Sequence, residues 1–180
     1  MEVPDKNLPR ATFQDLALPL FEQLYNFAHW LAQDANEAED LVQETYAKAL
    51  RGFSSFQAGT NFRAWIFRIL RNSFLTSRTG LKTKVALDDD GVEAIASAAP
   101  TPEQVLIEQA NREMLRAALT ELPVPYREIL LLCEVEEMSY EEIAQVLGIP
   151  AGTVMSRLHR ARKALRAELL RRLKEGPHGL

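Results

Sequence analysis

The sequence predicts an all-α protein of two small helical domains joined by a flexible linker, the second domain containing a helix-turn-helix. Apolar residues recur at helical spacing along most of the chain, and no stretch alternates apolar and polar residues as a half-buried strand does. The helical pattern is interrupted over residues 79–101 by glycines, a proline and an acidic run. We therefore expect one domain over residues 10–78, a linker over 79–101 and a second domain over 102–174.

The first domain is expected to be a small helical bundle. Residues 13–32 place apolar side chains on one side of a helix, with Pro19 either starting or kinking it. Residues 36–53 form a second amphipathic helix, and Asn61 can cap a third that runs to about residue 77. A loop is predicted over 54–60. The second helix carries a polar stripe opposite its apolar one: Asp40, Gln43, Glu44, Ala47 and Arg51.

The second domain begins where helical spacing resumes, with Pro102 in a first turn. This helix is expected to continue to about Leu122. Two prolines then break the chain before a further helix over residues 126–136.

A helix-turn-helix follows in the second domain. Ser139 and Glu142 have the spacing of a capping box, which opens a short helix over 140–147. Gly148 suits a left-handed turn, and Ala144 is small enough for two helices to cross there. The next helix has an expected buried stripe of Val154, Leu158, Ala161 and Leu165, and an exposed stripe of Met155, Ser156, His159, Arg160 and Lys163.

This last helix is predicted to be a recognition helix that enters the DNA major groove, its first turns reading base edges. The alternative, a basic helix that only packs and is solvated, accounts less well for the Ala144, Gly148 and Val154 spacing. The candidate DNA contacts are Thr153, Met155, Ser156, Arg157, His159, Arg160 and Lys163.

Charge is distributed very unevenly for a chain of net charge −4. Residues 45–87 contain eight Lys and Arg and no acid, and residues 147–174 contain eight basic residues and one acid. The rest of the chain is strongly acidic. Two basic segments in an acidic body indicate selective contact with a polyanion, although either alone could be a solvated helix face.

The first basic segment is also aromatic, a combination that suits unpaired DNA. Cations follow the phosphate backbone while aromatic rings stack on exposed bases. Trp65, Arg68 and Asn72 lie at i, i+3 and i+7, so they share one face of the third helix. Any single aromatic residue more often packs in a core, so this prediction rests on the combination.

Several function classes find little support. The chain has no nucleophile–base pairing, phosphate-cradling glycine loop or metal-ligand spacing, so we expect no enzyme activity, no catalytic residue, no cofactor and no metal. No secretory signal and no apolar run of membrane-spanning length is evident, which predicts a cytoplasmic protein without membrane insertion. The single cysteine, Cys133, is interpreted as a small buried hydrophobe rather than a redox sensor.

Three segments together carry a resemblance to a known family: "EAEDLVQETYAKAL", "GTNFRAWIFRILRN" and "LPVPYREILLLCEVEEMSYEEIAQVLGIPAGTVMSRLHRARKAL". In this order and at this separation they resemble bacterial RNA polymerase sigma factors of the small, two-domain extracytoplasmic-function type. The similarity extends from about Phe13 to Arg172, except for the linker.

The resemblance implies a role for each part. Asp40, Gln43 and Glu44 would dock on the clamp coiled coil of the largest subunit of core RNA polymerase, and the polymerase flap would be a further contact of the chain. The recognition helix would read the −35 element of promoter DNA. The third helix and the loop before it would capture and open the −10 element, with Asn72 and the loop lining a pocket for a flipped base. The candidate −10 residues are Asn61, Arg63, Trp65, Arg68, Arg71 and Asn72.

This sequence departs from many relatives at two places. Met155 stands where they have a basic residue, so a guanine or phosphate contact is not expected there, and an apolar contact such as one to a thymine methyl is the alternative. The third helix ends in "FLTSRTG" rather than in an acid with paired basic residues. The resemblance also implies control by an anti-sigma factor, and "GTNFRAWIFRIL" and "GTVMSRLHR" resemble a subgroup often paired with small zinc-containing inhibitors.

One rival class stays open at this point. A freestanding helix-turn-helix transcription regulator, with an N-terminal effector domain, would bind duplex DNA without help. Such a protein would have no use for a basic and aromatic face suited to strand opening.

Overall fold

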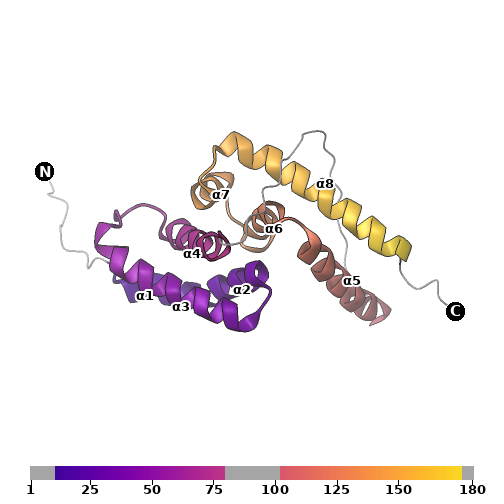
Figure 1. Cartoon of the computed structure of the whole chain (residues 1–180), viewed down its shortest axis with the longest axis horizontal. Coiled ribbons are helices and arrows are strands. Elements are labelled where there is room, and N and C mark those ends of the chain that lie inside the picture. Colours follow the sequence, from indigo (N-terminus) through magenta and orange to yellow (C-terminus); the bar gives the residue numbers. More distant parts are fainter. Residues whose placement is uncertain (1–10, 80–101, 176–180) are drawn as a thin grey trace, which may run out of the picture.

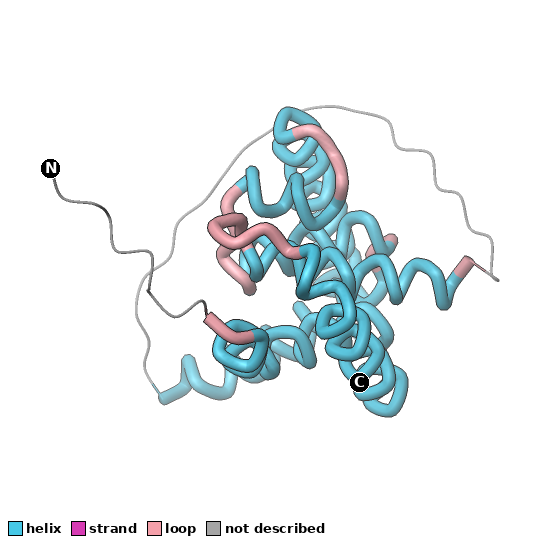
Figure 2. The backbone as a smooth tube through the Cα atoms, turned by 90° about the vertical axis from the view of Figure 1, so that its left-hand side faces the viewer, coloured by secondary structure: helices cyan, strands magenta, loops and turns pink. Residues whose placement is uncertain are grey.

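The computed structural model describes residues 11–79 and 102–175, and these are helical apart from short connections (Figures 1 and 2). No strand occurs within these two ranges, which confirms the predicted all-α class. All but one residue of the predicted linker, 79–101, lies outside the described residues.

The N-terminal half contains α1 (Phe13–Ala17), α2 (Phe21–Ala32), α3 (Ala35–Gly52) and α4 (Phe62–Arg78). The first predicted helix is split: a 3-10 turn, Leu18–Leu20, separates α1 from α2 because Pro19 has no amide hydrogen to continue the ladder. Asp34 and Asn61 cap α3 and α4 by accepting amide hydrogens of Glu37 and Ala64. The cap predicted at Asn61 is therefore confirmed.

The helices α2, α3 and α4 pack into one bundle around large apolar side chains. Phe27 and Phe67 meet at 5.4 Å between ring centroids, and both rings are fully buried. Burying an aromatic or aliphatic side chain contributes about 1.5–3 kcal/mol each, so this core fixes how α3 and α4 present their outer faces.

The C-terminal half contains α5 (Pro102–Glu121), α6 (Val124–Leu130), α7 (Tyr140–Leu147) and α8 (Ala151–Glu175). A π-helical turn, Leu131–Val135, extends α6, so the helix predicted over 126–136 is present but begins at Val124 and ends in π-helical geometry. The capping box predicted at Ser139 and Glu142 is present, and Gly148 adopts the predicted left-handed conformation, with φ 65° and ψ 38°. These features join α7 to α8 as a helix-turn-helix.

The two halves pack directly against each other, as Figures 1 and 2 show. Helix α4 contacts α7, α2 contacts α6, and the buried residues of both halves form one continuous apolar cluster. Arg127 ties the halves at a second place. Its buried guanidinium donates to the carbonyls of Leu119, Thr120 and Leu122 within its own half, and reaches Trp30 O at 3.4 Å in the other.

Candidate nucleic-acid interface

The helix-turn-helix positions the first candidate surface. Helix α8 buries Val154, Leu158 and Ala161 against the core, as predicted, while Leu165 is only partly buried. Met155, at 61% exposure, and Lys163 project away from the core. The remaining predicted contacts on this helix are half-buried: Thr153, Ser156, Arg157, His159 and Arg160.

His159 lies differently from its prediction. The exposed-stripe interpretation places its ring in solvent, but its Nε2 atom is buried and has no hydrogen-bond partner in the part of the chain that the structure describes. His159 is i+4 from Met155 and i−4 from Lys163, so it shares their face of α8, yet it is half-buried while they are exposed.

Helix α4 positions the second candidate surface. Trp65 packs against Phe56 at 5.0 Å and Phe62 at 5.5 Å between ring centroids, and it lies over Gly52. Its ring is therefore part of an aromatic cluster while remaining half-exposed. Arg68 and Asn72 are exposed on the same face, so the predicted three-residue face exists.

Three other candidates on or beside α4 are in contact with the C-terminal half. The Arg71 guanidinium donates to both carboxylate oxygens of Glu128, at 2.8 and 3.0 Å. Arg63 donates to the Glu136 carboxylate at 2.9 Å and to its carbonyl at 2.8 Å. The Asn61 amide donates to Glu142 at 2.5 Å. The structure thus divides the six −10 candidates into an outward-facing group and a group held at the boundary between the halves.

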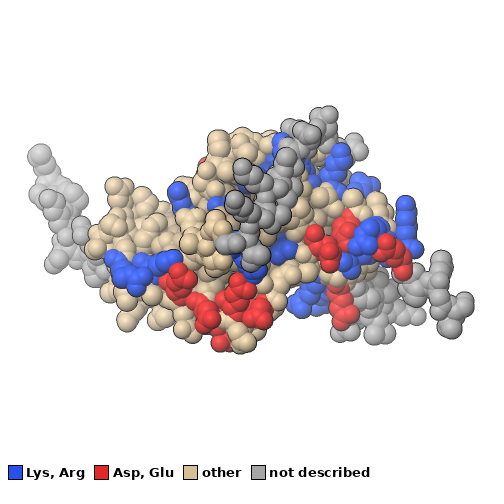
Figure 3. Space-filling model, in the orientation of Figure 1, with Lys and Arg blue, Asp and Glu red and all other residues tan. Residues whose placement is uncertain are grey.

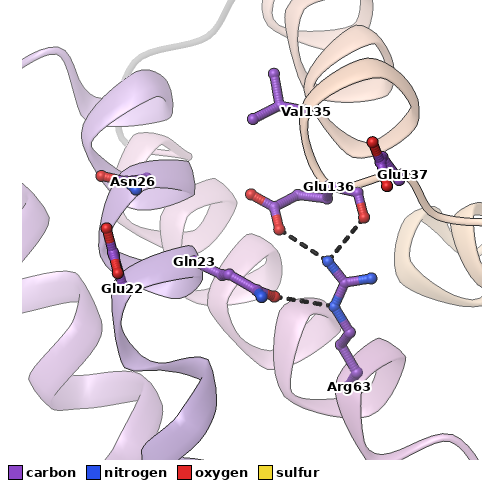
Figure 4. Close-up of a pocket in the computed structure, with 7 residues that line it drawn as sticks. All are labelled: Glu22, Gln23, Asn26, Arg63, Val135, Glu136 and Glu137. Atoms are coloured by element: carbon purple, nitrogen blue, oxygen red, sulfur yellow. Dashed lines mark hydrogen bonds and ion pairs between the residues drawn. The ribbon is translucent and has the colours of Figure 1, made fainter.

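Figure 4 shows the surroundings of Arg63. Its Nε donates to Gln23 of α2 at 3.1 Å, while Glu136 approaches from the opposite half. Burial raises the pKa of the Glu136 carboxyl, although Arg63 opposes that shift. The pKa of Glu142 is lowered, mainly because its carboxylate accepts the Ser139 amide hydrogen.

The predicted docking residues form a third surface. Asp40, Gln43 and Glu44 are all exposed on the outer face of α3, and Glu44 pairs with Lys48 at 2.5 Å. Figure 3 shows acidic side chains gathered along the lower edge of the N-terminal half. A carboxylate-rich face of this kind suits a basic protein partner and would repel DNA.

No site for a metal is built by the described residues, which contain no group of three or more His, Cys, Asp or Glu that could hold an ion. None of the helices in the described ranges is long and apolar enough to cross a membrane. Burial and the neighbouring Glu134 raise the pKa of the half-buried Cys133 thiol, which disfavours the reactive thiolate.

Comparisons with known proteins show the family to which the chain belongs. Two family models match: "Sigma-70 region 2" over residues 20–82 and "Sigma-70, region 4" over residues 112–165. The ECF RNA polymerase sigma factor EcfG of Rhodopseudomonas palustris is 39% identical over 158 residues, which cover 88% of this chain and 85% of that protein. The chain belongs to the sigma-70 family, in the extracytoplasmic-function (ECF) class.

One further relative of this sigma factor is similar in sequence and another in solved structure. The ECF sigma factor SigE of Mycolicibacterium smegmatis is 37% identical over 175 residues, covering 92% of this chain and 67% of that protein. The solved structure of the sigma factor RpoE from Bartonella quintana, in complex with the anti-sigma factor NepR, superimposes with a TM-score of 0.65. It is 30% identical and covers 88% of this chain and 96% of that one.

The matched regions contain every candidate residue of this sigma factor. The α3 and α4 candidates fall inside the region 2 match, and the α8 candidates fall inside the region 4 match. The resemblance to sigma factors is therefore confirmed, and the DNA and polymerase contacts of individual residues stay predictions.

Sequence reasoning missed the glutamates that meet α4. A signal was available for Glu128: it directly precedes the apolar run Ile129 to Leu132, and a carboxylate buried beside such a run requires a polar or cationic partner. Nothing local identifies that partner, because Arg71 lies 57 residues away in the chain. Glu136 and Glu142 gave no comparable signal, since both occur among other acids.

Proposed function

We propose that this sigma factor brings core RNA polymerase to promoters, reads the −35 element with the start of α8, and captures the −10 element with α4 to promote strand opening. One observation carries the proposal. A helix-turn-helix with an outward-facing recognition helix occurs in the same chain as a separate helix that presents Trp65, Arg68 and Asn72 together.

The α8 contacts are assigned by exposure and chemistry. The exposed Met155 suits a thymine methyl, and Arg157, Arg160 and Lys163 suit phosphates or guanine edges. Thr153, Ser156 and His159 lie in the same first turns and would make short-range polar contacts.

On α4, the half-exposed ring of Trp65 and the exposed amide of Asn72 would receive bases released from the duplex. Flipping a base costs a few kcal/mol, and stacking returns about 1–3 kcal/mol per base. Strand opening of this kind uses binding energy alone. We therefore propose that the chain has no catalytic residue and that core polymerase supplies the chemistry in the cytoplasm.

The exposed stripe of Asp40, Gln43 and Glu44 on α3 is the proposed docking surface for the clamp coiled coil of the largest polymerase subunit, and the C-terminal half would contact the flap. Control by an anti-sigma factor is supported by the Bartonella quintana relative, whose solved structure is such a complex. A zinc-containing inhibitor remains the expectation from the sequence motifs.

The rival, a freestanding regulator with an N-terminal effector domain, is disfavoured because the N-terminal half matches sigma-70 region 2. The two proposals differ in what the isolated chain does. A freestanding regulator binds duplex DNA tightly by itself, whereas the acidic body of this chain opposes such binding.

Transcription by reconstituted holoenzyme on fragmented genomic DNA from the native host tests the proposal. We expect run-off products from a set of promoters that share two sequence elements, and only weak gel-shift binding of the same promoters by the isolated chain. Nanomolar, sequence-specific binding by the isolated chain, together with no run-off products from holoenzyme, would contradict it.

A further inference from the structure

An aromatic cluster adjoins the helix that is proposed to capture the −10 element. It joins α1, α3, α4 and the connection between α3 and α4, with ring centroids of contacting pairs 5.0–6.3 Å apart: Phe13, Tyr46, Phe53, Phe56, Phe62 and Trp65. Aromatic rings at these separations attract one another in tilted and edge-to-face arrangements. The cluster therefore holds Trp65, its half-exposed member on α4, in one orientation.

Gly52, the last residue of α3, packs against the indole of Trp65. A Cβ atom at position 52 would lie 3.4 Å from Cζ2 and 3.8 Å from Cη2 of that ring. The backbone does not itself require glycine, because φ is −86° and ψ is −6°, a conformation open to residues with a side chain. The missing side chain thus makes room for the ring and is not needed for the turn.

Phe56 contacts the indole of Trp65 in a tilted arrangement. Their ring centroids are 5.0 Å apart and their planes meet at 42°. Phe62 contacts the same indole at 5.5 Å and 47°. Neither contact is a parallel stack, so these two phenyl rings brace the indole without pairing with it face to face. A base stacks on an aromatic ring face to face, and the half-exposed indole is available for that contact.

We propose that Gly52 and Phe56 are positioning residues for strand opening, which hold the indole of Trp65 in the orientation that stacks on a base released from the −10 element. Neither residue has to touch DNA in this role. The inference rests on the proposed function, because it concerns the geometry of the ring that the proposed function uses.

Holding the ring in advance matters because strand opening draws on binding energy alone. A ring that is free to change rotamer loses part of its stacking energy to the cost of being ordered. The segment that carries Phe56 is itself fixed to the end of α3. The Ser55 hydroxyl donates to the Gly52 carbonyl at 2.7 Å, and the Phe56 amide donates to the Phe53 carbonyl at 3.1 Å. Both braces of the indole thus belong to one ordered turn.

A double-mutant cycle tests whether Gly52 acts through Trp65. Gly52→Val places a stiff, branched side chain beside the indole. It is made in the full chain with Trp65 present and again together with Trp65→Ala. Ala35→Val is the matched control, because it adds a branched side chain at the exposed first residue of the same helix. The measurement is the rate at which holoenzyme opens a promoter found by run-off transcription, followed by permanganate reactivity of thymines in the −10 element.

We expect Gly52→Val to slow opening about tenfold when Trp65 is present, which corresponds to the loss of one base stack. In the Trp65→Ala chain the same change should slow opening by less than about twofold, because the ring through which it acts is gone. The control should also stay within about twofold of the unmodified chain.

Equal loss on Gly52→Val in the two backgrounds would show a merely structural role and overturn the inference, while the proposed function stands. Unchanged opening in Trp65→Ala alone would contradict the proposed use of that ring in strand opening, and this inference with it.

Phe56 supplies a second test that does not depend on Gly52→Val. Phe56→Ala removes the contact with the indole, whereas Phe56→Tyr keeps the ring and should restore most of the opening rate. The chain contains two tryptophans, so Trp30→Phe leaves Trp65 as the single fluorescent indole. In that background we expect the emission of Phe56→Ala to shift to longer wavelength, since the released ring gains contact with water, and that of Phe56→Tyr to remain unshifted. Equal emission and equal opening rates in Phe56→Ala and Phe56→Tyr would overturn the inference.

Discussion

At the scale of single residues, the turn between α7 and α8 depends on one backbone conformation. Gly148 has φ 65°, in the left-handed region of backbone conformation. A residue with a Cβ atom is less stable there than glycine by about 1–2 kcal/mol. Its position was predictable from sequence because a turn between two amphipathic helices requires such a residue locally. The same holds for the caps at Asn61 and Ser139.

Gly148→Ala should therefore lower the free energy of unfolding by about 1–2 kcal/mol. Gly152→Ala is the matched control: it lies in the first turn of α8 without positive φ, and a methyl group added there has open space. We expect the control to be neutral or stabilising by up to about 1 kcal/mol. Urea unfolding followed by circular dichroism measures the unfolding free energy of both variants. Equal values for Gly148→Ala and Gly152→Ala would show that the turn tolerates a side chain at Gly148.

Glu142 adds a pH dependence at the same scale. Its pKa is lowered from 4.5, first by the Ser139 amide hydrogen and further by the Asn61 side chain. A carboxyl whose folded pKa is depressed stabilises the protein above its unfolded pKa and loses that contribution as pH falls through the folded value.

The difference in unfolding free energy between the unmodified chain and Glu142→Gln should accordingly be constant above pH 4.5 and shrink below it. Thermal unfolding over a pH series provides the measurement. The conservative Glu141→Gln, at an exposed neighbour, serves as the control. A difference that grows on acidification would contradict the assigned role of the carboxylate.

At the scale of elements, the helices were largely predictable, and the departures have local causes. Helical periodicity identified each helix, but it cannot distinguish an α-turn from a π-turn, so the Leu131–Val135 turn was missed. Periodicity likewise left open whether Pro19 starts or kinks a helix, and the structure gives a 3-10 turn there. Periodicity also placed His159 on the outer face of α8, but it could not show that the Nε2 atom of its ring is buried.

A substitution at Met155 tests whether the N-terminal turns of α8, rather than the whole helix, read the bases of the −35 element. Met155→Ala should leave stability nearly unchanged but reduce the preference of holoenzyme for its own −35 element over a scrambled one by about fivefold, through a lost apolar base contact. Leu173→Ala is the control, since Leu173 lies on the same helix with the same 61% exposure but at the far end. Competition binding with the two duplexes measures the preference. Equal loss of preference in both variants would contradict base reading at Met155.

At the scale of the whole molecule, sequence reasoning predicted two halves but not their contact. The ion pairs of Arg63 and Arg71 join residues more than fifty positions apart in the chain. A local sequence pattern cannot predict which distant residues will pair in this way. Family resemblance supplied the functions of the halves, whereas only the structure shows that three −10 candidates face the C-terminal half. The predicted contacts of DNA with α4 thus depend on the arrangement of the whole chain.

Permanganate reactivity of thymines in the −10 element tests the central claim, that α4 captures bases only together with core polymerase. We expect reactivity with holoenzyme, none with the isolated chain or with core alone, and a loss of roughly tenfold in Asn72→Ala through one lost base contact. Asn72 is exposed, so this change leaves the core intact, and Asn111→Ala, at another exposed position on α5, is the control. Reactivity with the isolated chain, or equal reactivity of the two variants, would contradict the account.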